Sequence, residues 1–223
     1  MSFTRPLIKE WGDRKELRHV RNRLEKEGCS FKVIPAEGTE DVLTELKRIS
    51  DAWLEDKNTR EKGFSLGFFD PVYIKRYPIA VVRRGGKIVA FTNLWQGADK
   101  DELSMDLMRY SSEAPDSVMD YLIVRLILWG RDQGYHWFSL GMAPLSGLES
   151  HPGLSPLWSR IGAFVHRHGE HFYNFQGLRH YKDKFHPEWE PRYLAIPGGL
   201  KLPRVFTNIA SLTSGGMKGV IAK

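Results

Sequence analysis

The chain has 223 residues and a net charge of +6, with 41% hydrophobic and 27% charged residues, a composition typical of a globular protein with a sizeable core. The best apolar run, Tyr121 to Trp129, contains Arg125 and is too short to span a bilayer. The single cysteine, Cys29, excludes an intrachain disulfide framework. The basic balance favours an anionic partner such as RNA or phospholipid.

Two helices and a strand are predicted at the start of the chain. From Arg14 to Glu27 apolar residues recur at helical spacing, the other faces are basic, and Gly28 is a typical helix stop. Phe31 to Ile34 has the pattern of a strand. Glu40 to Leu54 has helical apolar spacing, and its acidic start suits the helix dipole.

The middle of the chain predicts a hairpin, a strand, a long helix and a further strand. Gly85 and Gly86 form the hairpin turn, because glycine permits the positive φ angles of a two-residue turn. A proline near its start and Gly134 at its end delimit the helix. The predicted ranges are Ile79–Arg83, Lys87–Trp95, Glu102–Tyr110, Pro115–Gln133 and His136–Leu140.

A loop rich in Gly, Pro and Ser, GMAPLSGLESHPGLSP, opens the less regular C-terminal part. The elements predicted after it are a helix at Leu157–Phe164, a segment at Phe172–Phe175, a helix at Leu178–Lys184 and a strand at Arg192–Ile196. The order of helices and strands along the chain is that of an acetyltransferase-like (GNAT) α/β domain, a mixed sheet flanked by helices. Such a fold does not by itself fix a function.

Asp106 and Arg109 are the first candidate site residues. In a regular strand Leu103, Met105 and Leu107 share one face, and strict alternation puts Arg109 opposite Asp106. A β-bulge between them would bring both into one cleft, and bulges are frequent beside active sites. A surface ion pair at a strand end explains the spacing equally well.

The segment HGEHFYNFQGLRHYKDKFHPEW is the second candidate, because it mixes basic, amide and aromatic side chains. In a helix over Leu178–Lys184, Arg179 and Lys182 would share one face and suit a phosphate, although a solvated basic face is the usual reading. Five of the eight histidines lie in or beside this segment. We expect no metal site, since no cysteine or second histidine cluster completes a zinc ligand set.

Several motifs of acyl and phosphate chemistry are missing from the sequence. It has no Gly-rich phosphate loop and no serine nucleophile elbow. The Arg/Gln-x-x-Gly-x-Gly/Ala turn that binds acyl-CoA in acetyltransferases is also missing, and the nearest string, RDQGYH at Arg131, lies at the wrong end of a helix. A GNAT-like fold without this turn indicates a different acyl donor.

Five segments together resemble the C-terminal synthase domain of the bacterial lysyl- and alanyl-phosphatidylglycerol synthases, the multiple peptide resistance factor family. They are EKGFSLGFFDPVYIKRYPIAVVRR, AFTNLW, DLMRYSSEAPDSVMDYLI, GYHWFSLGMAPLSGL and HGEHFYNFQGLRHYKDKFHPEWEPRYLA. The resemblance implies an enzyme that moves lysine or alanine from aminoacyl-tRNA to the glycerol hydroxyl of phosphatidylglycerol. It implies no cofactor and no metal, and a membrane surface made less anionic, which is a route to antimicrobial peptide resistance.

The resemblance also implies a place for this part within a longer protein. Family members carry membrane helices and another GNAT-like half before it, at the cytoplasmic face of the inner membrane, so we expect this chain by itself to be soluble. We divide it into an N-terminal basic helix region (residues 1–30), a GNAT-like catalytic domain (31–200) and a C-terminal tail (201–223).

The chemistry of such a transfer suggests roles for the candidate residues. The donor and the attacking hydroxyl must be held together, and charge that develops on the ester carbonyl must be stabilised. Asp106 suits the α-ammonium group of the donor, and Arg109 would orient Asp106 or meet a phosphate. Tyr73 and Glu170 are candidates for positioning or proton transfer.

Phosphate and tRNA contacts are expected from basic side chains. Lys182, with Arg179 and Lys184, would bind the phosphate of the lipid or of the tRNA 3′ end. The basic N-terminal helix would contact the tRNA backbone through Arg14, Arg18, Arg21 and Arg23. A solvated helix on a basic protein is the alternative.

Three other functions remain open from the sequence. One is a tRNA-dependent transferase acting on a peptide or another lipid, as in the peptidoglycan-bridge ligases. Another is a non-catalytic GNAT-like module that binds RNA or an anionic membrane. The third, an acetyl-CoA-dependent acetyltransferase, is disfavoured by the missing acyl-CoA turn.

Overall fold

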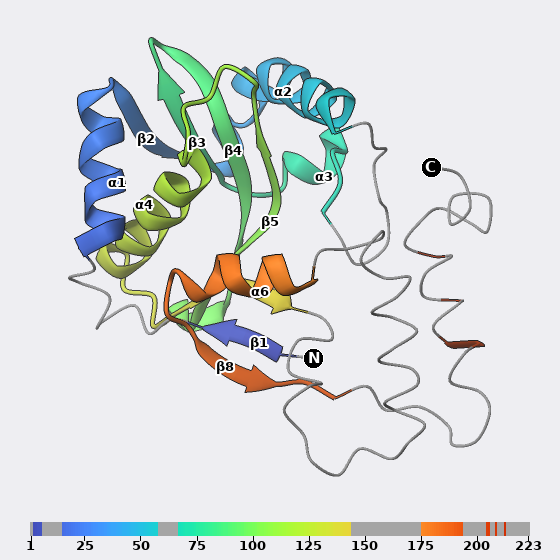
Figure 1. Cartoon of the computed structure of the whole chain (residues 1–223). Coiled ribbons are helices and arrows are strands. Elements are labelled where there is room, and N and C mark those ends of the chain that lie inside the picture. Colours follow the sequence, from blue (N-terminus) through green and yellow to red (C-terminus); the bar gives the residue numbers. More distant parts are fainter. Residues whose placement is uncertain are drawn as a thin grey trace.

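A computed structural model describes residues 2–5, 15–57, 67–143 and 175–193, with 204–205, 208 and 212 (Figure 1). The strands form a five-stranded sheet, β2-β3-β4-β5-β6, and a three-stranded sheet, β7-β1-β8. The strands are β1 (Ser2–Arg5), β2 (Cys29–Ile34), β3 (Ile79–Arg84), β4 (Lys87–Gln96), β5 (Glu102–Tyr110), β6 (Trp137–Ser139), β7 (Gly141–Ala143) and β8 (Glu188–Pro191). The helices are α1 (Lys15–Lys26), α2 (Leu43–Asp56), α3 (Pro71–Ile74), α4 (Val118–Asp132) and α6 (Phe175–Asp183).

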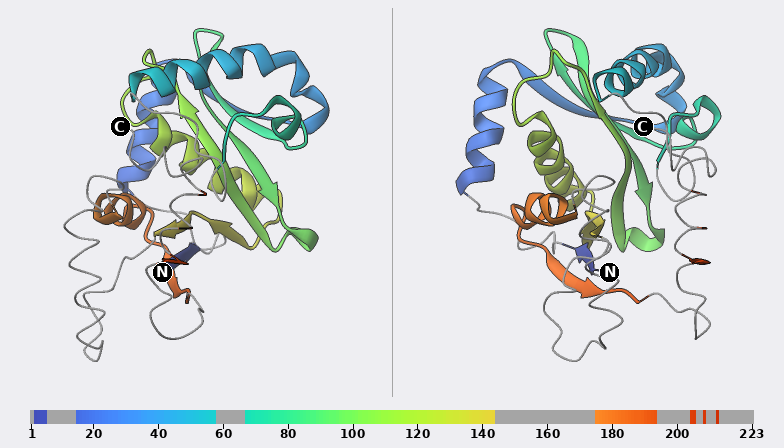
Figure 2. Two further views of the ribbon diagram at one scale, coloured as in Figure 1. Left: turned by 90° about the vertical axis from the view of Figure 1, so that its right-hand side faces the viewer. Right: turned by 45° about the vertical axis from the view of Figure 1, so that its right-hand side comes forward.

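The five-stranded sheet confirms the expected GNAT-like α/β fold. Strands β2 to β5 are antiparallel to their neighbours, and β6 is added parallel to β5. Helices α1 and α4 cover one face of the sheet, and α2 and α3 cover the other (Figures 1 and 2). Each face has its own apolar cluster, because the β3 residues Ala80 and Val82 point to α4 while Ile79 and Val81 point to α2.

Helix α1 belongs to the same packed unit as the sheet. Its apolar stripe, Leu17 and Leu24, is buried in the cluster that also contains most of α4. Arg23 Nη2 donates a hydrogen bond to the main-chain oxygen of Asp116 at 3.1 Å, and Arg125 of α4 forms an ion pair with Glu25. The helix of the expected region 1–30 therefore shares its core with the region 31–200.

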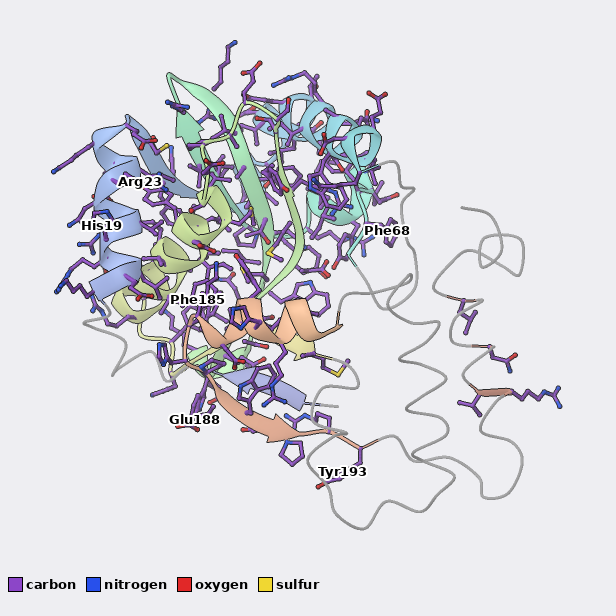
Figure 3. The ribbon with its side chains drawn as sticks, in the orientation of Figure 1. His19, Arg23, Phe68, Phe185, Glu188 and Tyr193 are labelled. Carbon is purple, nitrogen blue, oxygen red and sulfur yellow. The ribbon has the colours of Figure 1, made fainter. Side chains whose placement is uncertain are left out.

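The three-stranded sheet was not foreseen from the sequence. Strand β1 lies in its centre, antiparallel to both β7 and β8. Helix α6 lies beside this sheet and reaches the larger apolar cluster through Phe185, which lies between α6 and α4 and is fully buried (Figure 3). Strands of three or four residues carry too little periodicity to be recognised, so pairing with distant partners defines them.

One strand prediction is wrong for the part of it that the structure describes. A strand was expected at Arg192–Ile196, but β8 ends at Pro191, and Tyr193 beyond it is 88% exposed. Pairing with β1 selects residues 188–191, whose own pattern is polar. Three predicted parts lie outside the described residues: residues 194–196, the expected helix at 157–164 and the segment 172–174. Within the described part, no helix is long and apolar enough to cross a membrane.

Candidate active site

A β-bulge in β5 lies at the candidate carboxylate. Leu94 pairs with Met105 and Thr92 pairs with Met108, so the single residue Asn93 faces both Asp106 and Leu107. Two residues against one is the definition of a bulge, and it interrupts the alternation of side chains.

The bulge turns Asp106 and Arg109 toward the same face of the sheet. Asp106 contacts Tyr73 of α3, and Arg109 lies against Trp53 of α2; both helices cover that face. The expected bulge is therefore present and brings the two residues to one side of the sheet, whereas a cleft shared by both stays a prediction.

A chain of hydrogen bonds holds the Asp106 carboxylate. The hydroxyl of Tyr73 donates to Oδ2 at 2.7 Å, and Nδ2 of Asn93 donates to the same oxygen at 3.3 Å. The indole N–H of Trp95 donates in turn to the Tyr73 oxygen at 3.0 Å. One carboxylate oxygen thus receives two donors, which fixes the orientation of the group.

Tyr73 is a donor in this arrangement rather than a base. Burial, followed by the hydrogen bond to Asp106, raises the pKa of Tyr73 well above its ordinary value, so its hydroxyl keeps its proton at neutral pH. The local sequence places it: Asp70 caps α3 by accepting the Tyr73 main-chain N–H at 2.7 Å, and Pro71 starts the helix. Phe68 stacks on the ring at 6.0 Å between centroids.

Gly67 closes the other side of the carboxylate with bare backbone. A Cβ atom at this position would lie 2.7 Å from Asp106 Oδ1 and 2.7 Å from the main-chain nitrogen of Leu107. Only glycine permits so close an approach of two chain segments. The segment Gly67–Tyr73 therefore lies against Asp106, with backbone beside Oδ1 and the Tyr73 phenol on Oδ2.

Arg109 is buried under an aromatic ring. Its guanidinium carbon lies 4.3 Å from the centroid of Trp53, and its Nη1 donates to the main-chain oxygen of Met108 at 2.9 Å. Only 8% of the residue is exposed. A planar cation on an indole ring is held by electrostatic attraction and by dispersion, so α2 fixes the position of this charge.

Lys182 is buried at the three-stranded sheet. It is 7% exposed, and its ammonium donates to the main-chain oxygen of Met142 in β7 at 2.7 Å. Burial lowers the pKa of Lys182 to about 8, because the charged form is poorly solvated there. A Cβ atom at Gly141 would lie 3.7 Å from the Lys182 Nζ.

The split between the two sheets relates Lys182 to Asp106. Strands β5 and β6 pair only from Glu102 to Ser104, where the last pair is Ser104 with Ser139. Beyond that pair the chain leaves for β7 in the other sheet, so Asp106 and Gly141 occupy corresponding positions on strands that separate. Asp106 thus lies on one of the two strands that separate, and the ammonium of Lys182, from α6, bonds to the main chain of the other.

Arg179 of α6 and Lys184, which follows the helix, also have partners within the fold. Lys184 Nζ lies 2.8 Å from both carboxylate oxygens of Asp120 in α4. Arg179 stacks on Trp189 of β8 with 4.6 Å from its guanidinium carbon to the ring centroid. Arg179 and Lys182 thus contact different strands of the small sheet, and their joint use for one phosphate stays a prediction.

The residues expected to bind tRNA are only partly described. Arg14 lies outside the described residues, as does Glu170. Arg18 is exposed on α1, whereas Arg21 donates to the side chain of Asn22. Arg23 lies on α1 next to α4 and donates to a main-chain oxygen there (Figure 3).

An open groove of about 540 Å³ lies elsewhere, along the outer side of α2 beside Phe69 and Pro71. None of the candidate residues lines it. Sequence reasoning missed Gly67, Asn93 and Trp95 because their roles come from pairing between segments. A buried asparagine in an otherwise apolar strand was the one available signal for Asn93.

The sequence of the chain matches one family of known proteins. Residues 12–196 match the family model described as "Phosphatidylglycerol lysyltransferase, C-terminal". The phosphatidylglycerol lysyltransferase of Bacillus subtilis (strain 168) is 43% identical over 181 residues, which are 80% of this chain and 21% of that protein. That of Staphylococcus xylosus is 40% identical over 179 residues, with the same shares of 80% and 21%. The chain spans about a fifth of the length of these curated relatives.

Two solved structures are similar over nearly the whole chain. One, from Agrobacterium fabrum, carries the name C-terminal domain (DUF2156) of putative lysylphosphatidylglycerol synthetase; it is 42% identical, has a TM-score of 0.84, and aligns 98% of this chain with 67% of its own. The other is L-PGS from Bacillus licheniformis, 37% identical with a TM-score of 0.82, aligning 95% of this chain with 65% of its own.

Proposed function

The chain belongs to the phosphatidylglycerol lysyltransferase C-terminal family, and we propose that it forms the centre that transfers an amino acid from aminoacyl-tRNA to phosphatidylglycerol. Lysine is the first choice over alanine, because the relatives carry the name lysyltransferase. The whole protein would act at the cytoplasmic face of the inner membrane and make its lipids less anionic.

The observation that carries the proposal is the fixed carboxylate of Asp106 at the split between the sheets. An aminoacyl donor brings an α-ammonium group, and a charge-assisted hydrogen bond to a carboxylate is the strongest simple way to hold it. Tyr73 and Asn93 already occupy Oδ2. A carboxylate that is oriented in advance loses little freedom when the donor binds.

The reaction needs positioning more than activation, because an aminoacyl-tRNA ester is already reactive. The glycerol hydroxyl oxygen of the lipid attacks the ester carbonyl and forms the new carbon–oxygen bond. The bond from that carbonyl to the ribose oxygen breaks, and the hydroxyl proton ends on the ribose oxygen. Holding both substrates in reach supplies much of the rate enhancement.

Lys182 suits the anionic substrate. With a pKa of about 8 it is mostly cationic at neutral pH, and its burial beside β7 places that charge where water screens it weakly. We assign it to a phosphate of the lipid or of the tRNA 3′ end. Arg109, held by Trp53 on the same face as Asp106, is the second candidate cation.

The basic helix α1 is the proposed contact for the tRNA backbone. Among its predicted contacts, Arg18 is exposed, and Arg21 and Arg23 form hydrogen bonds with Asn22 and Asp116. Backbone contacts of this kind supply affinity that falls as salt rises.

The test is transfer of labelled amino acids from a mixed charged-tRNA pool to phosphatidylglycerol vesicles, with the full-length protein and with this chain. We expect a lysyl lipid ester, and Asp106→Asn should lower transfer roughly tenfold or more because a charge-assisted hydrogen bond is lost. Asp101→Asn, the same change at an exposed position before β5, should leave transfer unchanged. Label on a peptide, or tRNA binding with no transfer by either form, would contradict the proposal.

A further inference from the structure

We infer that Asn93 is the positioning residue that presents Asp106 to an unsubstituted ammonium group, and that it thereby makes the site prefer an α-amino acyl donor over its α-hydroxy counterpart. The inference rests on the proposed function in one respect, that Asp106 contacts the acyl donor. The geometry of Asn93 itself is independent of that function.

Asn93 ties the bulge to the carboxylate through both ends of its amide. Its Oδ1 accepts the main-chain N–H of Leu107 at 2.8 Å, and its Nδ2 donates to Asp106 Oδ2 at 3.3 Å. The orientation of the amide follows from chemistry, since an N–H needs an acceptor and a carboxylate needs a donor. The residue is fully buried. One side chain thus satisfies the main-chain N–H of Leu107 at the bulge and sets the direction of the residue before it.

The Asp106 residue is only half-buried, so part of its carboxylate can be reached by a ligand. Oδ2 accepts from Tyr73 and Asn93, whereas Oδ1 lies beside the bare backbone of Gly67. Trp95 and Phe68, respectively 46% and 38% exposed, stand beside the Tyr73 ring at the surface. A carboxylate oxygen near exposed aromatic rings suits a cation.

If the acyl donor carried a hydroxyl in place of its α-ammonium group, its hydrogen bond to Asp106 would have no positive charge on the donor. A hydroxyl still donates to an ionised carboxylate, but it lacks the Coulomb attraction that an ammonium adds, and this attraction depends on how closely Asp106 is aimed at the group. If Asn93 served only to stabilise the bulge, its replacement would weaken the binding of both donors by the same factor. The preference between the two donors is therefore the quantity that separates positioning from mere support.

The experiment uses two stable probes, the 3′-amide-linked lysyl adenosine and its analogue with a hydroxyl replacing the α-ammonium group. Their dissociation constants are measured by calorimetry on the whole chain. We expect the unaltered protein to prefer the ammonium probe by about tenfold or more. Asn93→Leu, which keeps the size of the side chain but removes both hydrogen bonds, should reduce that preference to below about threefold.

Thr92→Val is the matched control. Thr92 is also fully buried in β4, and its hydroxyl donates only to a main-chain oxygen, that of Asn93, at 3.1 Å. This variant should keep the preference of the unaltered protein. If Asn93→Leu keeps it as well, or weakens both probes by the same factor, the inference is overturned.

A second measurement needs no variant and covers the case in which Asn93→Leu does not fold. In NMR spectra of the unaltered chain, the side-chain amide signals of Asn93 should shift with the ammonium probe and much less with the hydroxyl probe. Equal shifts with both probes would overturn the inference. Probe preference without any lipid ester would refute the proposed function while supporting this inference, and lipid transfer with a preference unchanged in Asn93→Leu would do the reverse.

Discussion

Replacing Lys182 by methionine changes how the stability of the protein depends on pH. Burial lowers the pKa of Lys182 from 10.5 to about 8, a difference that corresponds to about 3 kcal/mol. Between these two values the unfolded chain holds a proton that the folded chain has lost. Stability contributed by this residue therefore rises with pH through the window, being lowest below pH 8 and greatest above 10.5.

The assay is urea unfolding followed by tryptophan fluorescence at several pH values from about 7 to 10.5, a range set by the two pKa values. Methionine keeps most of the volume of lysine and has no titrating group, so the variant lacks this rise. Across the window, the free energy of unfolding of the unaltered protein should rise by up to about 3 kcal/mol relative to that of the variant. Ionisations elsewhere cancel in the difference.

Lys47→Met is the control, since the Lys47 side chain is 56% exposed in an ion pair on α2. Its free energy of unfolding should run parallel to that of the unaltered protein between pH 8 and 10.5, because both proteins keep the Lys182 contribution. If the curves for Lys182→Met and the unaltered protein are also parallel there, the ammonium is not desolvated and the reasoning is refuted.

Three further outcomes are expected. Tyr73→Phe removes one donor from Asp106, so lipid transfer should fall by about tenfold, measured as labelled lipid against Tyr77→Phe; equal activity would contradict the role. Gly67→Ala brings a Cβ to 2.7 Å from main chain, so calorimetric melting should come at a lower temperature, and an unchanged melting temperature would contradict the close approach. Arg18→Glu should weaken tRNA binding and flatten its salt dependence in filter binding, unless α1 is only a solvated face.

Long periodic segments were the predictable part of the fold. The spacing of apolar residues placed α2 and α4 within a few residues of their observed limits, because each helix repeats its pattern over several turns. Helix α3 has only four residues and was missed, since a single turn has no period. It is set by the Asp70 cap and the proline after it, which are local signals of a helix start.

The site was predictable only where one segment carried the information. A bulge between Asp106 and Arg109 was expected because it could bring both into one cleft, and the strand register confirms the bulge itself. The buried contact of Lys182 with Met142 could not be foreseen, because it depends on β7 leaving one sheet for another. The role of Gly67 could not be foreseen either, because the space for a side chain there is taken by Asp106 and Leu107 of β5.

The central position of β1 has a consequence for how the protein folds. The strand nearest the N-terminus pairs on one side with residues 141–143 and on the other with residues 188–191. Contacts so distant along the chain close slowly, because the entropy of a long loop is lost before any pairing compensates for it. During synthesis β1 leaves the ribosome before both of its partners and must wait for the later of them, β8. Lys182, which contacts this small sheet, would accordingly acquire its surroundings late, after the five-stranded sheet has formed.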